Sequence, residues 1–175
     1  MMCWRKRGGE SHSGKQGRGS ANKTPFVAAI SLNEEGHPIK MNMNVVKGFK
    51  LDEIKRWATT HLQAGSTIIS DGLACFRAVK EANCEHQRVV TGGGPAYVEI
   101  EEFQWVNTMI GNVKTSMHGA YHAINPKHLP RYLAEFCYRF NRRFELDKLL
   151  PRFMYVAIRT PPMPYRLLIM AEVYG

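Results

Sequence analysis

Residues 67–72 have the sequence Thr-Ile-Ile-Ser-Asp-Gly, and this short stretch indicates the class of fold. A run of strand-forming residues that ends in an aspartate and a glycine is typical of a buried strand whose carboxyl end lies at the rim of a sheet. Ligands of α/β proteins collect at that rim. Asp71 is therefore the first candidate for a functional side chain, and an aspartate in an ordinary turn is the alternative interpretation.

The segment before this strand predicts a β-hairpin followed by a helix. Residues 26–32 form a compact apolar run after Pro25, and residues 39–46 alternate between apolar and polar side chains, as in a strand with one face in water. Apolar residues at helical spacing over 51–62, with two acids in the first turn, predict a helix that ends at Gly65.

The segment after Asp71 predicts a further strand and several helices. A short helix is expected over residues 74–82 and a strand over 87–90. Longer helices are expected over about 103–117 and 129–143, another from about residue 147, and a short last helix over 165–173. This order of elements indicates an α/β fold with a mixed sheet.

The composition is that of a globular protein with a polyanionic partner. The 175 residues suffice for one domain with a core, and an apolar share of 44% with a charged share of 22% is ordinary. The net charge of +9 is concentrated in two zones, because residues 1–25 hold six Lys or Arg against one acid and residues 126–159 hold eight against three. Charge alone does not distinguish DNA from RNA or from a membrane surface.

Cysteine usage and hydropathy exclude several classes of protein. The four cysteines form no Cys-x-x-Cys pair, which favours reduced thiols over a zinc site. No apolar run approaches the ~20 residues that a membrane span needs. The basic N-terminal stretch is followed by no apolar segment, so it is not a signal peptide.

Asn107 and Lys114 form a second candidate site. They are seven residues apart, so on a helix they share one face with a rise of ~10 Å between them. The asparagine offers an amide oxygen to a metal or a sugar-phosphate, and the lysine offers a point charge to a phosphate. Gly111 lies between them and leaves room for a ligand. The alternative is an ordinary solvated helix face.

Other polar clusters are weaker candidates. His118, His122 and His128 are expected to be loop histidines near phosphate rather than metal ligands, because Gly119 is expected to end the helix. Residues 92–94 are three glycines without the Gly-Lys-Ser/Thr ending of a nucleotide-binding loop. The helix over 129–143 is expected to turn its arginines outward, some in ion pairs with Glu135 and some free for phosphates; these arginines are Arg131, Arg139, Arg142 and Arg143.

Several stretches resemble transposases of ISXO-type insertion sequences. Residues 8–10, 17–29 and 70–76 resemble segments of this family. Two longer motifs are more specific: residues 105–114, Trp-Val-Asn-Thr-Met-Ile-Gly-Asn-Val-Lys, and residues 131–144, Arg-Tyr-Leu-Ala-Glu-Phe-Cys-Tyr-Arg-Phe-Asn-Arg-Arg-Phe. The resemblance covers nearly the whole chain.

The resemblance implies a ribonuclease-H-like catalytic fold with a ligand triad of the Asp-Asp-Glu or Asp-Asp-Asn type. Asp71 resembles the second acid, Asn107 the third ligand in its asparagine variant, and Lys114 the basic residue seven places on. It also implies two divalent ions, Mg²⁺ or Mn²⁺, one activating water or a 3′-hydroxyl and the other stabilising the leaving oxygen. Asp71 and Asn107 are then the expected metal ligands, and Lys114 is an expected DNA contact.

The chain departs from the family pattern before Gly8-Gly9-Glu10. The family places its first catalytic aspartate a few residues upstream of this motif, whereas the first aspartate of this chain is Asp52. We therefore expect an N-terminally truncated or frameshifted protein that lacks the first strand of the fold and is inactive on its own. Residues 1–24 are expected to be a flexible basic arm, and residues 25–175 an incomplete catalytic domain.

The expected function is DNA transposition by descent, in the bacterial cytoplasm at the nucleoid. The alternative is a non-catalytic DNA-binding protein that inhibits full-length transposase by competing for transposon ends or by pairing with it. An RNA-binding module is disfavoured, because the strands carry no stripes of aromatic residues. The expected partner is the DNA of transposon ends and target, and a homo-oligomer is left open. The expected DNA contacts are Lys15, Arg18, Lys114, Arg139, Arg142 and Arg143.

Overall fold

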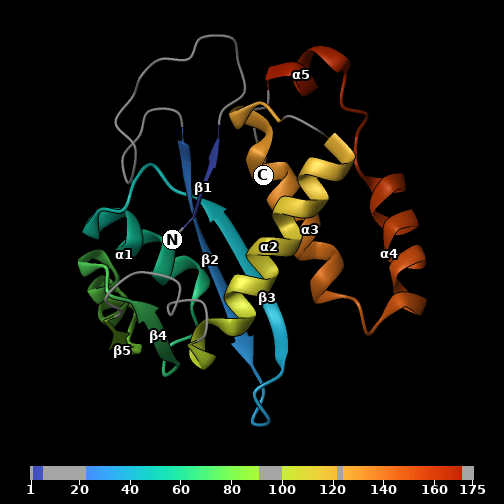
Figure 1. Ribbon diagram of the computed structural model, residues 1–175. Helices are drawn as coiled ribbons and strands as arrows, with labels where there is room; N and C mark the ends of the chain where they lie inside the picture. Colours follow the sequence, from blue (N-terminus) through green and yellow to red (C-terminus); the bar gives the residue numbers. More distant parts are fainter. Residues whose placement is uncertain (1, 6–22, 91–99, 122–123, 171–175) are drawn as a thin grey trace.

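The computed structural model describes residues 2–5, 23–90, 100–121 and 124–170. These residues form strands in the first half of the chain and helices in the second (Figure 1). In chain order the elements are β1 (Met2–Arg5), β2 (Lys23–Leu32), β3 (Pro38–Val45), α1 (Leu51–His61), β4 (Thr67–Asp71), the 3₁₀ helix η1 (Ala74–Ala82), β5 (Glu85–Val89), α2 (Glu101–Tyr121), the 3₁₀ helix η3 (Pro126–His128), α3 (Leu129–Asn141), α4 (Leu146–Arg159) and α5 (Tyr165–Met170).

The strands form two sheets, which corrects the expectation of one mixed sheet. β1, β2 and β3 are antiparallel, and β4 and β5 form a separate parallel pair. The cause lies in the short β1, which pairs from Met2 opposite Phe26 to Arg5 opposite Lys23. Among the described strands, residues 27–32 of β2 therefore pair with β3 alone, and no strand connects β2 to β4. The α/β class is confirmed.

Strand β2 separates two hydrophobic clusters, because its successive side chains point to opposite faces. Phe26 packs with Met41 and Met43 of β3 against α2 and α3. Val27 packs instead with α1 and η1. We call β2, β3, α2 and α3 the β2–β3 unit, and α1, β4, η1 and β5 the β4–β5 unit. Figure 1 shows the β4–β5 unit on one side of β2 and helices α2 and α3 on the other.

The face of β3 that was expected to lie in water is partly covered by α1. The indole Nε1 of Trp57 donates to Asn44 Oδ1 at 3.0 Å, and the Asn42 amide lies 3.4 Å from His61 Nδ1. The alternation was predicted correctly, since Met41 and Met43 are buried on the other face. The polar face differs because its amides bind a helix rather than solvent.

Helix α3 is attached to β3 by an asparagine clamp. Asn141 Oδ1 accepts the Met41 N–H at 2.7 Å, and Asn141 Nδ2 donates to the Met41 carbonyl at 2.9 Å. One side chain thereby satisfies both backbone groups of an edge-strand residue. Arg142 leaves the helical conformation directly afterwards. The helix consequently ends at Asn141, two residues before the predicted end.

The N-terminal region contains a strand where none was expected. Met2–Arg5 forms β1, and β2 begins at Lys23 rather than after Pro25. The antiparallel edge of β2 supplies backbone partners for this short segment. The prediction that no strand precedes Pro25 is wrong, whereas the division of the chain at residue 24 stays a prediction.

Two further boundaries differ from the sequence-based expectation. Helix α2 continues through Gly119 to Tyr121, because a helical glycine costs only about 1 kcal/mol and Met117 anchors this turn in the core. Strand β5 begins at Glu85, which pairs with Thr67 at the start of β4. The parallel partner thus sets the start of β5.

The C-terminal helices lie outside both hydrophobic clusters. Helix α4 has no buried residue, and Phe153 is 62% exposed. Helix α5 is attached through its backbone, since Lys127 Nζ donates to the Ile169 carbonyl at 2.6 Å and Arg131 Nη1 to the Leu168 carbonyl at 3.2 Å. No helix in the described part of the chain is long and apolar enough to cross a membrane.

Candidate active site and nucleic-acid interface

Asp71 lies at the carboxyl end of β4, as predicted. Its side chain is half-buried, and its Oδ1 accepts the Leu73 N–H at 3.3 Å. This contact is the local bond of an aspartate in a turn. The next residue, Gly72, lies against the neighbouring strand end, since an added Cβ would be 3.6 Å from Val90 Cα. Asp71 therefore combines a turn contact with a position at the rim of the parallel pair.

Asn107 and Lys114 lie on one face of α2 and are both half-buried. The Nδ2 atom of Asn107 is buried and has no hydrogen-bond partner among the described residues. An unpaired buried amide costs about 1–3 kcal/mol, and such groups are concentrated at functional sites. A Cβ added at Gly111, between them, would have no atom within 4 Å. The stripe from Asn107 to Lys114 is therefore open at its middle and carries an unsatisfied polar group.

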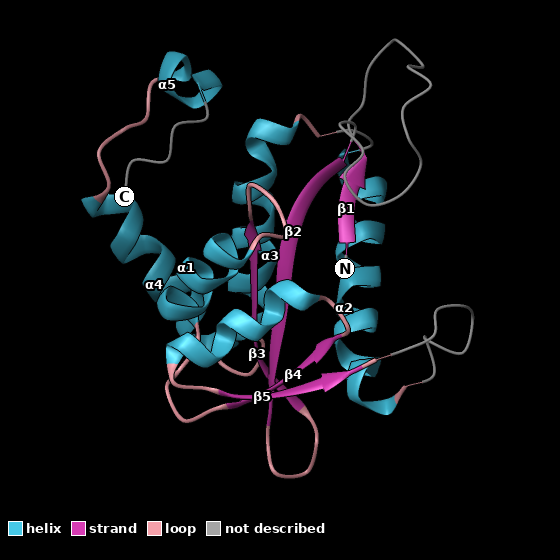
Figure 2. Cartoon of the chain, turned by 90° about the vertical axis from the view of Figure 1, so that its left-hand side faces the viewer, coloured by secondary structure: helices cyan, strands magenta, loops and turns pink. Residues whose placement is uncertain are grey.

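The two candidate sites belong to different units. Asp71 ends a strand of the β4–β5 unit, whereas α2 packs on β2. Figures 1 and 2 agree that the carboxyl end of β4 lies beside the first turns of α2. Asn107 is in the second turn of that helix and Lys114 is two turns further on.

The ligand set for a pair of divalent ions is incomplete in the described residues. In residues 2–5, 23–90, 100–121 and 124–170, no group of three His, Cys, Asp or Glu side chains could hold a metal ion. Asp71 contributes one carboxylate and Asn107 one amide. A two-metal phosphoryl-transfer site needs further charged oxygen ligands. These residues therefore do not fit two Mg²⁺ or Mn²⁺ ions by themselves.

The predicted histidine cluster is only partly visible. His118 lies in α2 and His128 ends η3. The expectation that Gly119 ends the helix before a loop histidine is wrong for His118, which is helical. His122 lies outside the described residues, as do Lys15, Arg18 and the glycines at 92–94.

The arginines of α3 have different environments. Arg139 Nε lies 2.6 Å from Glu135 Oε1, and the Arg142 guanidinium lies 4.1 Å from the Tyr138 ring centroid. Arg143 donates to the carbonyls of Pro38, Ile39 and Phe140, and burial lowers its pKa. Arg143 thus helps to attach the end of α3 to β3, whereas Arg139 is exposed and Arg142 is half-buried.

A basic cavity of about 410 Å³ lies between β3, α3 and α4. We call it the α3–α4 cavity; its lining residues are Lys40, Asn141, Arg142, Glu145, Lys148 and Arg152. Four of the six are cations, and Glu145 is paired with Lys148 at 3.2 Å. The net positive charge of this lining fits phosphate groups. Part of the predicted basic zone over residues 126–159 therefore lines a single cavity.

Sequence reasoning missed two features of this region. The Asn141 clamp joins residues one hundred positions apart, and no local pattern signals it. The second is a set of cations on η1 and β5, Arg77, Lys80 and Arg88, which lie scattered in a neutral stretch of sequence. Their spacing of three residues on η1 was the available signal, because a 3₁₀ helix stacks such residues on one side.

Comparison with protein families gives a match over most of the chain. The model of the ISXO2-like transposase domain matches residues 4–141. The chain belongs to this family. The match includes β4 with Asp71, α2 with Asn107 and Lys114, and all of α3. The ISXO2-like resemblance seen in the sequence is thereby confirmed, and no curated protein and no solved structure matches the chain.

Proposed function

We propose that the chain acts in DNA transposition as a DNA-binding protein built on the catalytic domain of ISXO2-like transposases. The match over residues 4–141 carries this proposal, because it includes every described candidate residue of β4 and α2. A ribonuclease-H-like fold is part of the proposal. The order of elements supports this fold: three antiparallel strands are followed by a helix and a parallel pair of strands.

Asp71, Asn107 and Lys114 are the residues that we assign to the site. Asp71 and Asn107 are the ligands that this chain would offer to Mg²⁺ or Mn²⁺, and Lys114 would contact a DNA phosphate. A divalent ion held by these two residues would supply Lewis-acid stabilisation of the phosphoryl oxygens. The rim position of Asp71 and the placement of Asn107 and Lys114 on one face of α2 support these roles.

We propose further that the 175-residue chain binds DNA without cleaving it. Cleavage by a two-metal site needs further carboxylates beside Asp71, and the described residues hold no group of three or more His, Cys, Asp or Glu that could bind a metal ion. The basic surfaces do not depend on those carboxylates. This combination supports the second candidate function, inhibition of a cleavage-competent transposase by competition for transposon ends.

The DNA contacts that we propose lie on α2, α3 and the N-terminal region. Lys114 lies on α2, Arg139 on α3 and Arg142 directly after α3, and Lys15 and Arg18 are proposed from sequence. Arg143 contributes indirectly, by holding the end of α3 on β3. Phosphate contacts of this kind give salt-sensitive binding with little sequence preference.

The test is fluorescence anisotropy with labelled duplexes that carry either the ends of the insertion sequence or a scrambled sequence. We expect binding that weakens steeply with salt, with a log–log slope of about −0.9 for each phosphate contact. A cleavage-competent family member should transfer fewer strands when the chain is added. Absence of DNA binding at about 50 mM salt would overturn the proposal.

A further inference from the structure

A second basic cavity, on the far side of the β4–β5 unit, has no role in the proposed metal site. Its volume is about 680 Å³, and η1 and β5 supply most of its lining. We call it the η1–β5 cavity. Its charged and titratable lining residues are Arg77, Lys80, Glu81, His86 and Arg88.

The cations of this cavity are available to a ligand. Arg77, Lys80 and Arg88 are exposed, and none has an ion pair or a side-chain hydrogen bond with a described residue. Glu81, the acid in the lining, forms an ion pair with Lys55 of α1. Three positive charges therefore face the hollow while its acid is already neutralised by a lysine from outside the lining.

The 3₁₀ conformation of η1 aligns two of these cations. With three residues per turn, side chains at i and i+3 eclipse each other, so Arg77 and Lys80 stand in one row with a rise of ~6 Å. One strand of B-DNA has a phosphate about every 3.4 Å along the helix axis. The row therefore spans slightly less than two phosphate steps along the helix axis.

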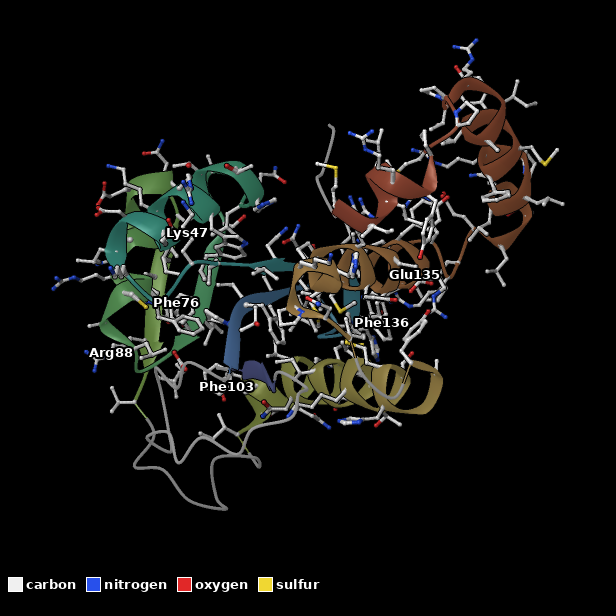
Figure 3. All side chains as sticks on the ribbon, turned by 90° about the horizontal axis from the view of Figure 1, so that it is seen from above. Lys47, Phe76, Arg88, Phe103, Glu135 and Phe136 are labelled. Atoms are coloured by element: carbon white, nitrogen blue, oxygen red, sulfur yellow. The ribbon has the colours of Figure 1, made fainter. Side chains whose placement is uncertain are left out.

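Strand β5 adds the third cation from the facing side. His86 and Arg88 are two residues apart and so share one face of the strand. Ser70 Oγ lies 2.8 Å from His86 Nε2, and this contact holds the imidazole, which lines the cavity. Burial first, and then the charges of Lys80 and Arg88, lower the pKa of His86. In Figure 3 Arg88 projects outward from this side of the molecule.

Arg88 of the cavity points away from Asp71, whereas Leu73 of the lining donates its N–H to Asp71 Oδ1. Arg88 is in register with Ser70, and Val89 with Asp71. Because successive residues alternate between faces, Arg88 and Asp71 point to opposite faces of the pair. A phosphate held by Arg88 is therefore away from the candidate metal ligands, and this contact positions DNA rather than reacting with it.

We infer that the η1–β5 cavity binds the phosphate backbone of duplex DNA through Arg77, Lys80 and Arg88, a contact surface additional to α2 and α3. The inference rests on the proposed function, since it assumes that DNA is the partner of this chain. A free phosphate or a nucleotide has the same chemistry. The open row of two cations favours a polymer with successive phosphates.

The test compares two triple variants with equal loss of charge. One is Arg77→Ala, Lys80→Ala and Arg88→Ala, and the matched control replaces three exposed cations outside the cavity: Lys47, Arg159 and Arg166, each by Ala. All six side chains are exposed, so both proteins should fold, which thermal unfolding checks. Anisotropy with one labelled duplex is recorded over a series of salt concentrations. Isothermal titration with inorganic phosphate follows for each protein.

The expected result is a salt slope that is smaller by about 2–3 in the cavity variant, with a loss of affinity of at least about tenfold, and a change below about 1 in the control. Equal behaviour of the two variants, with DNA binding by the unaltered chain intact, would overturn the inference and leave the proposed function standing. Micromolar binding of inorganic phosphate that the cavity variant loses, without a change in DNA slope, would overturn DNA as the ligand. Failure of the unaltered chain to bind DNA would overturn the proposed function itself.

Discussion

The β4–β5 unit is local in sequence, whereas the β2–β3 unit is assembled from distant segments. All four elements of the β4–β5 unit lie between Leu51 and Val89. In the β2–β3 unit, α3 reaches β3 across one hundred residues through the Asn141–Met41 clamp. Local contacts form at a lower loop-closure cost than distant ones. The candidate site, with Asp71 in one unit and Asn107 in the other, therefore depends on strand β2, which contributes residues to the hydrophobic clusters of both units.

The largest expected effects come from the two hydrophobic clusters. Ile54 and Leu133 are each fully buried, one in each unit, so Ile54→Ala and Leu133→Ala should each lower the free energy of unfolding by about 2–5 kcal/mol. Because β2 contributes neighbouring residues to both clusters, each substitution should shift one common transition. Urea unfolding followed separately by Trp57 and Trp105 fluorescence, in variants that keep one tryptophan, measures this. Two transitions at different urea concentrations would show that the units unfold independently.

A smaller effect is expected from the clamp. Asn141→Ala removes two hydrogen bonds to Met41 and should lower the free energy of unfolding by about 2 kcal/mol. The control is Asn33→Ala, whose side chain accepts one exposed turn N–H, from His37. Hydrogen exchange at the Met41 amide should accelerate in the Asn141 variant and not in the control. An unchanged exchange rate of the Met41 amide in the Asn141 variant would show that the clamp does not stabilise this part of β3.

The link between the units can be measured as a coupling between Asp71 and Asn107. If their side chains converge, Asn107→Asp should raise the affinity for Mn²⁺ about tenfold, which is about 1.4 kcal/mol. The same substitution made together with Asp71→Asn should raise it far less, because the partner carboxylate is gone. Electron paramagnetic resonance of free Mn²⁺ gives the Mn²⁺ affinities of the unaltered chain, the two single variants and the double variant. Equal effects of Asn107→Asp in both backgrounds would place the residues in separate sites.

The smallest expected effect concerns pH. Burial lowers the pKa of His61 and His86 below the ordinary value of 6.5, and the charges of Lys80 and Arg88 add to the effect at His86. The unfolded state then binds more protons than the folded state just below pH 6.5, so stability should fall as pH decreases through that range. His86→Gln should flatten this dependence of the melting temperature on pH. A steeper pH dependence of the melting temperature in the His86 variant would contradict the lowered pKa of His86 in the folded state.

Local patterns predicted much of this fold. The alternation over residues 39–46 and the apolar run of residues 26–32 gave the hairpin, and helical spacing gave α1, α2 and α3. The rim position of Asp71 followed from an apolar strand that ends in an acid. These features depend on neighbours in sequence, which is why a sequence alone reveals them.

Features that depend on distant partners could not be predicted in the same way. The split into two sheets follows from how far β1 pairs along β2, and the polar face of β3 is covered because Trp57 and His61 bind its asparagines. The η1–β5 cavity needs the 3₁₀ geometry of η1 and the parallel register of β5 together. The apolar residues of α4 have helical spacing but pack in neither cluster. Periodicity therefore predicts the helix correctly but does not show whether its apolar face is buried.

The most direct test of the account is incubation of the purified chain with supercoiled DNA that carries the insertion-sequence ends, in Mg²⁺ or Mn²⁺. The account predicts salt-sensitive binding without nicks, and the same result for Asp71→Asn. Metal-dependent nicking by the unaltered chain that Asp71→Asn abolishes would contradict it, and would show that the chain completes its own catalytic site.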